Sequence, residues 1–160
     1  MLWRRYRRIV VTSVPVAALI GAFLALALYL GANPDYREQG GWSAFVSLAA
    51  TGAVVGALTS LPAVLGAAAA LTFRDRSLAR APQARVLIGG LGAAVGALVC
   101  WTAVATFASV MSPDGGSWFP LYEAVAAGAS VISGIAAAVL IGWTESRVES
   151  AESPAAAANL

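Results

Sequence analysis

The sequence has no histidine and no lysine, and its 160 residues include one cysteine, Cys100. Without histidine, histidine-ligated haem, histidine-containing metal sites and Ser-His or Cys-His catalytic pairs are excluded. One cysteine permits neither an intramolecular disulfide nor a CxxC redox motif. Because no nucleophile–base pair or metal-ligand set remains, we expect no cofactor, no metal and no enzyme activity.

Charge is also scarce, since only 11% of the residues are charged while 59% are hydrophobic and the mean hydropathy is +0.78. Soluble domains carry about a quarter charged residues. This chain therefore has too little polar surface for a soluble globule, which indicates an integral membrane protein with the lipid bilayer as its main surroundings. The basic residues flank apolar runs instead of forming a folded basic face, so nucleic acid is not an expected partner.

Four apolar stretches are long enough to cross the hydrocarbon core as helices, which takes about 20 residues. They cover approximately residues 9–30, 44–73, 86–111 and 121–143. The connections between them are rich in helix breakers or charge and lie at Gly31–Gly41, Arg74–Arg85 and Ser112–Pro120. The sequence thus predicts an all-α, four-transmembrane-helix bundle over residues 1–145. Residues 146–160 are expected to form a largely disordered cytoplasmic tail.

The arginines predict the orientation. Nine of the ten lie in the N-terminal segment, the second connection or the tail, and only Arg37 lies on the other side. The positive-inside rule then places both termini in the cytoplasm. A composition rich in Ala, Gly and Arg without Lys is typical of GC-rich bacterial genomes, so we expect a bacterial cytoplasmic (inner) membrane. A cleavable signal peptide is the alternative for the first stretch, but its apolar run exceeds the roughly 7–15 residues of such peptides.

Small residues recur at every fourth position of the apolar stretches, a spacing that lets helix backbones approach closely in lipid. The helix-packing candidates are Gly52, Gly56, Gly92, Gly96, Ser130, Gly134 and Ala138. Abundant Ala and Gly produce such pairs by chance. The stripe through Ser130, Gly134 and Ala138 is long enough that we nevertheless expect it to face another helix.

Few residues are candidates for a functional role within the apolar stretches. Pro62 removes a backbone hydrogen bond to Leu58 and predicts a bend eased by nearby hydroxyls, with a gating hinge as the alternative. Glu123 is expected to complement the dipole at the start of the fourth helix, with an ion or substrate role as the alternative. Glu145 and Arg147 follow the last apolar stretch and are expected to be solvated.

Two internal matches raise the question of a duplication. GAVVGAL at 52–58 resembles GAAVGAL at 92–98, and the two outer loops share Pro-Asp, Gly-Gly and a following Trp, namely Trp42 and Trp118. Because the two matches have different offsets, one duplication cannot explain both of them. The loop match would relate the first helical hairpin to the second, a doubled helical hairpin, although turn chemistry alone also explains it. The two tryptophans then form either part of a partner-binding cap or two unrelated interfacial anchors.

The sequence leaves two functions open. We expect a non-catalytic accessory or structural subunit that acts by helix packing against itself or other membrane protein subunits. The alternative is a small oligomeric transporter or channel with hydroxyl-lined helices. Co-purification of a partner, or solute flux through the pure protein, would separate the two.

Overall fold

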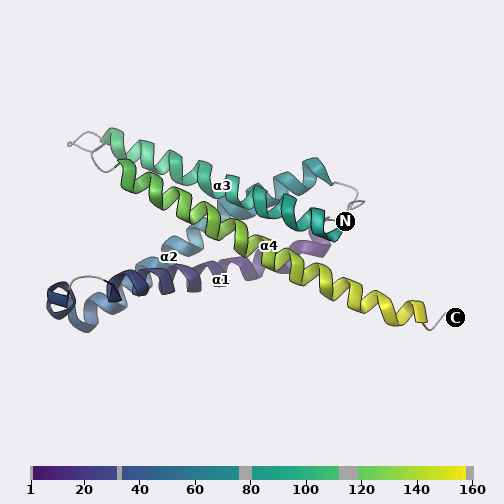
Figure 1. Cartoon of the computed structure of the whole chain (residues 1–160), viewed down its shortest axis with the longest axis horizontal. Helices are drawn as coiled ribbons and strands as arrows, with labels where there is room; N and C mark the ends of the chain where they lie inside the picture. The colour runs from purple at the N-terminus through teal and green to yellow at the C-terminus, as the bar shows by residue number, and fades with distance from the viewer. Residues whose placement is uncertain (1, 32–33, 76–80, 112–118, 158–160) are drawn as a thin grey trace. The chain divides into compact units, whose positions relative to one another are not determined.

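The computed structural model describes residues 2–31, 34–75, 81–111 and 119–157, and it describes side chains between residues 6 and 147 apart from Tyr36. The described residues form four helices (Figure 1), which are α1 (Leu2–Leu30), α2 (Pro34–Arg74), α3 (Pro82–Met111) and α4 (Phe119–Ala157). Each is long and apolar enough to cross a membrane. The expected all-helical fold with four helices of membrane-spanning length is therefore confirmed.

The helices extend beyond the apolar stretches. α2 begins at Pro34 because proline at a first helical position loses no hydrogen bond and the following Asp35 complements the helix dipole. Residues 34–40, expected in a loop, are therefore helical. α4 continues through Pro154 to Ala157, across the segment that the sequence predicts to be largely disordered.

α2 has a break at Gly41. Gly41 is the residue of α2 with non-helical backbone angles, φ 54° and ψ −151°, a region that is essentially restricted to glycine. The Tyr29 hydroxyl lies 3.2 Å from the Arg37 carbonyl oxygen and 3.1 Å from that of Gly41, next to the break. The helix runs through Pro62 without such a departure. Upstream of it, the Ser60 hydroxyl donates to the Ala57 carbonyl.

The chain divides into two compact units. The hairpin unit is Val11–Leu61, and the large unit combines Met1–Val10 with Pro62–Leu160. The boundaries fall inside α1 and α2. As a result, the first turns of α1 belong with α3, α4 and the second half of α2.

In the hairpin unit, α1 and α2 touch through glycine backbone. A Cβ atom added at Gly21 would overlap the carbonyl oxygen of Gly52 and lie 3.0 Å from the Cα of Gly56. A Cβ added at Gly52 would lie 2.6 Å from the Cβ of Ala25, and one at Gly56 would overlap the carbonyl oxygen of Ala17. The two antiparallel backbones are thus in direct contact, with no space for a side chain between them.

The same contact recurs in the large unit between α2 and α3. A Cβ added at Gly66 would overlap the carbonyl oxygen of Gly92 and lie 3.0 Å from the Cα of Gly96. A Cβ added at Gly92 would lie 2.6 Å from the Cβ of Ala70, and one at Gly96 would overlap the carbonyl oxygen of Pro62. Residues 62, 66 and 70 of α2 therefore repeat the arrangement of residues 17, 21 and 25 of α1.

α3 and α4 lie side by side in the large unit (Figure 1). The Ser130 hydroxyl donates to the Ala94 carbonyl oxygen at 2.9 Å. A Cβ added at Gly134 would lie 3.1 Å from the Cβ of Ala94, and one at Gly90 would lie 3.2 Å from the Cβ of Ala138. The stripe through Ser130, Gly134 and Ala138 thus faces α3, at a somewhat wider spacing than the α2–α3 contact.

Large apolar side chains on all four helices point outward. Leu19 on α1, Leu65 on α2, Leu91 on α3 and Ile135 on α4 are exposed to between 61% and 72%. Soluble monomers rarely expose contiguous apolar surface beyond a few hundred Å². These outward faces are what a lipid environment requires.

Candidate functional site

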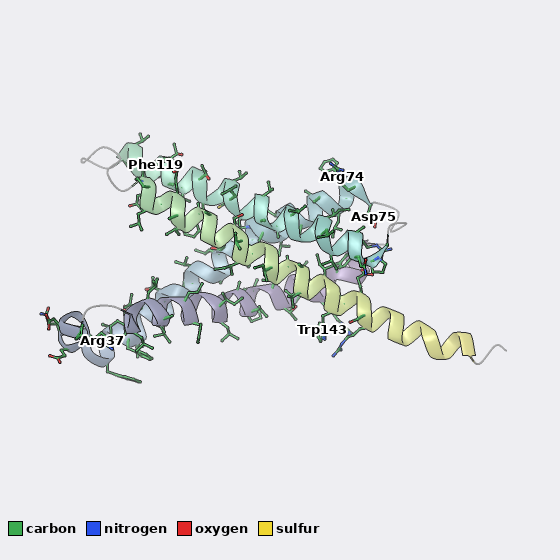
Figure 2. All side chains as sticks on the ribbon, in the orientation of Figure 1. Arg37, Arg74, Asp75, Phe119 and Trp143 are labelled. Carbon is green, nitrogen blue, oxygen red and sulfur yellow. The ribbon has the colours of Figure 1, made fainter. Side chains whose placement is uncertain are left out.

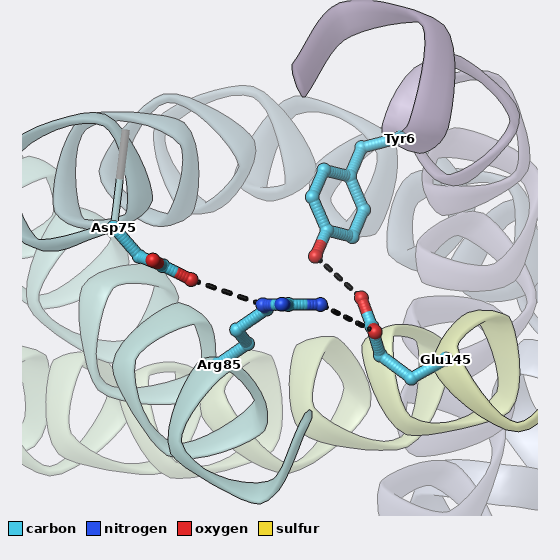
Figure 3. A network of polar contacts seen from close by, with 4 residues as sticks. All are labelled: Tyr6, Asp75, Arg85 and Glu145. Atoms are coloured by element: carbon cyan, nitrogen blue, oxygen red, sulfur yellow. Dashed lines mark hydrogen bonds and ion pairs between the residues drawn. The ribbon is translucent and has the colours of Figure 1, made fainter. Parts of the chain in front are cut away.

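A buried polar network connects four segments of the large unit (Figure 3). Tyr6 comes from α1, Asp75 follows the end of α2, Arg85 lies near the start of α3, and Glu145 lies on α4. Arg85, Asp75 and Glu145 are 7%, 3% and 2% exposed. The network therefore places charged groups inside the protein at the point where four helical segments meet.

Arg85 is the centre of the network. Its Nε donates to Asp75 Oδ2 at 3.0 Å, and its Nη1 donates to Glu145 Oε2 at 2.8 Å. The Tyr6 hydroxyl donates to the other carboxylate oxygen, Oε1 of Glu145, at 2.6 Å. A planar guanidinium holds two carboxylates in fixed directions, which a lysine ammonium would not do. Hydrogen bonds between ionised groups are about twice as strong as neutral ones.

The local chain geometry explains these positions. The Asp75 amide donates to the Leu71 carbonyl at 2.8 Å, so the backbone keeps its helical hydrogen bond one residue past the end of α2. The Arg85 amide donates to the Ala81 carbonyl at 3.2 Å, which fixes the first turn of α3. Both side chains are therefore directed by ordered backbone on either side of the α2–α3 connection.

An apolar layer lies one helical turn from the network. Leu71 and Ile141, each four residues before a carboxylate of the network, are buried together with the ring of Tyr6, and Ile9 packs against them. A Cβ added at Gly89 would overlap the Ile141 side chain, so glycine at this position makes room for the layer. The surrounding apolar groups exclude water from the ion pairs and strengthen them.

The network corrects two expectations. Glu145 is not solvated but is one of the most buried charged side chains that the structure describes, and Arg85 is not only a basic residue flanking a span. Arg147 is exposed as expected, with its guanidinium carbon 4.1 Å from the ring centre of Trp143. The sequence did contain one signal for this network. The predicted orientation already places Tyr6, the α2–α3 connection and the end of α4 on the same side of the membrane.

The remaining candidates from the sequence lie apart from the network. Glu123 is exposed and lies beyond the first turn of α4, where the dipole has weakened. Trp42 is exposed and stacks on Phe45 with ring centres 5.0 Å apart. Pro62 contributes its carbonyl oxygen to the contact with Gly96. Trp118 lies outside the described residues.

Two hydroxyl side chains of α3 donate hydrogen bonds to their own helix. Thr106 donates to the Thr102 carbonyl and Ser109 to the Ala105 carbonyl, both at 2.8 Å. Within the described part of the chain, no cluster of three or more His, Cys, Asp or Glu side chains is placed to hold a metal ion. Comparison with protein-family models, with curated proteins and with solved structures found no match to this chain.

Proposed function

We propose that this chain is a multi-pass protein of a bacterial cytoplasmic membrane and acts as a non-catalytic subunit through helix packing. Its partners are other membrane protein subunits or further copies of itself. The orientation has both termini in the cytoplasm, which the distribution of nine of the ten arginines favours. The network of Tyr6, Asp75, Arg85 and Glu145 then lies at the cytoplasmic end.

The observation that carries the proposal is the use of small and polar residues for packing within the chain. Gly66, Gly92 and Gly96 bring two backbones into contact without room for a solute between them. Arg85 and Glu145 bond to each other in a buried ion pair. Such features favour a rigid helical module over a moving pathway. The outward apolar faces remain available to lipid or to helices of a partner.

The test is purification of the full chain from its native membranes in a mild detergent, followed by measurement of the mass of the complex. We expect a stoichiometric assembly heavier than one chain. Single tryptophan substitutions at Leu19, Leu65, Leu91 and Ile135, one exposed position on each helix, should locate the interface. At least one should dissociate the assembly while leaving the unfolding of the chain itself unchanged, and the variants that keep the assembly serve as matched controls.

A monomer that moves a solute when it is reconstituted alone in liposomes would contradict the proposal. That outcome would favour the alternative function, a small transporter or channel. The Arg85→Lys variant offers a further distinction, because loosening a purely structural network should change stability without changing any flux.

A further inference from the structure

One face of α3 packs against α2 in the first half of the helix. Gly92 on this face lies against the backbone of Gly66. One turn later, Gly96 lies against the carbonyl oxygen of Pro62. Pro62 is also the first residue of α2 that belongs to the large unit. Because the two helices are antiparallel, the part of α2 in this unit ends opposite Gly96.

The same face continues as an open groove in the second half of α3. Val99, Ala103, Phe107 and Val110 follow Gly96 at spacings of three or four residues, and they line the groove together with Leu98, Thr102 and Thr106. Val99, Phe107 and Val110 are 64%, 65% and 73% exposed. Figure 2 shows side chains projecting outward along this half of α3, near Phe119 at the start of α4. The lining carries no charge, so an occupant must be apolar too.

The Thr102 hydroxyl gives this apolar groove one polar group. The hydroxyls of Thr51, Thr59, Thr72 and Thr106 each donate to the carbonyl oxygen four residues earlier. Among the described residues, the Thr102 hydroxyl has no such partner. A hydroxyl is both a donor and an acceptor, so it can pair with an identical hydroxyl across a two-fold axis.

We propose that a second copy of this chain docks in the groove, with the two α3 helices related by a two-fold axis along the membrane normal. The groove of one copy contacts the groove of the other. Thr102 bonds to Thr102 of the second copy, and the small Ala103 lets the backbones approach. The docked helix continues the interface that α2 makes on this face at Gly92 and Gly96. The inference rests on the proposed function, and it names the partner and the surface.

The test is oxidative cross-linking of the full chain in its native membranes with copper phenanthroline. Ala103→Cys is introduced into the Cys100→Ser chain, which otherwise has no thiol. We expect a disulfide-linked dimer that a reducing agent separates. Val131→Cys in the same background is the matched control, because Val131 is an exposed apolar residue of α4 outside the groove and should give no dimer.

A second measurement tests the threonine pair. Dimer affinity is measured by energy transfer between fluorescently tagged chains over a range of protein-to-lipid ratios. Thr102→Val keeps the shape of the side chain and removes the hydroxyl, so it should weaken dimerisation by about threefold, the effect of one hydrogen bond between helices in a membrane. Thr106→Val is the matched control, because the Thr106 hydroxyl already bonds to the Thr102 carbonyl, and it should dimerise like the unmodified chain.

Three outcomes would overturn the inference. They are no cross-linking at position 103, equal cross-linking at positions 103 and 131, and equal dimer affinity of the two threonine variants. If cross-linking fails although the chain purifies in an assembly heavier than one chain, another partner or another face holds the assembly, and the proposed function stands. If the chain is also monomeric in its native membranes, the inference and the proposed function both fail.

Discussion

Replacing Gly66 with alanine tests the backbone contact between α2 and α3. The added methyl group would overlap the carbonyl oxygen of Gly92 and lie 3.0 Å from its carbonyl carbon and from the Cα of Gly96. Ordinary contacts begin at 3.4 Å. All three neighbouring atoms belong to backbone, so no side chain can rotate away. The two helices must separate or tilt.

The expected change in the free energy of unfolding is the result of two opposing effects. Overpacking a close-packed interface costs about 1–3 kcal/mol. Alanine in place of glycine in a helix gains about 1 kcal/mol. Gly128→Ala isolates the gain, because Gly128 lies in the interior of α4 and a Cβ there meets nothing within 4 Å. We therefore expect Gly66→Ala to be less stable than Gly128→Ala by about 1–3 kcal/mol.

The assay is SDS-induced unfolding in mixed micelles, followed by circular dichroism, on the two variants and the unmodified chain. Gly21→Ala should match Gly66→Ala, because Gly21 makes the same overlap with Gly52 in the hairpin unit. The two contacts share no residue, so the double variant should show the sum of both losses. Equal stability of Gly66→Ala and Gly128→Ala would refute the claim that the α2–α3 backbones touch.

Three further predictions concern α4, the polar network and the orientation. Gly134→Leu should destabilise the chain in detergent, seen as a lower midpoint of thermal unfolding, because a Cβ there already lies 3.1 Å from Ala94. Arg85→Gln should cost about 3–5 kcal/mol in SDS unfolding by leaving buried carboxylates uncompensated, and Arg85→Lys should cost less; equal losses would contradict the bridging role. Reporter fusions after Ser150 should give a cytoplasmic signal and fusions within Gly31–Gly41 a periplasmic one; the reverse pattern would overturn the orientation.

The sequence predicted the helices well because membrane-spanning length and apolar composition are local properties. The ends of the helices were harder to predict, because a helix start such as that at Pro34 and Asp35 is signalled by only one or two residues. The polar network was missed for a different reason. Asp75 and Glu145 are 70 residues apart in sequence, and both meet Arg85 only after the helices have packed. Nothing in the local pattern around either carboxylate distinguishes it from a solvated one.

The duplication illustrates how a weak match can have a structural basis. The doubled hairpin predicted from the outer loops would pair residues of α2 with residues of α4. Aligning Trp42 with Trp118 gives an offset of 76 residues, so Gly52 corresponds to Gly128, where an added Cβ would meet nothing within 4 Å. The 40-residue match instead pairs Gly52 with Gly92 and Gly56 with Gly96, and these pairs make equivalent contacts. The loop comparison itself depends on Trp118, which lies outside the described residues.

The repeated contact also gives Pro62 a packing role. Residues 62, 66 and 70 occupy the places that Ala17, Gly21 and Ala25 hold in α1, and both sets cross an antiparallel helix through a pair of glycines. The atom that Pro62 presents to Gly96 is its backbone oxygen, so the contact depends on an ordered helix there. Any movement of the Pro62 backbone away from α3 would break this contact. Within the large unit, the second half of α2 therefore packs on α3 through backbone at Pro62 and Gly66, which is a structural use for both residues.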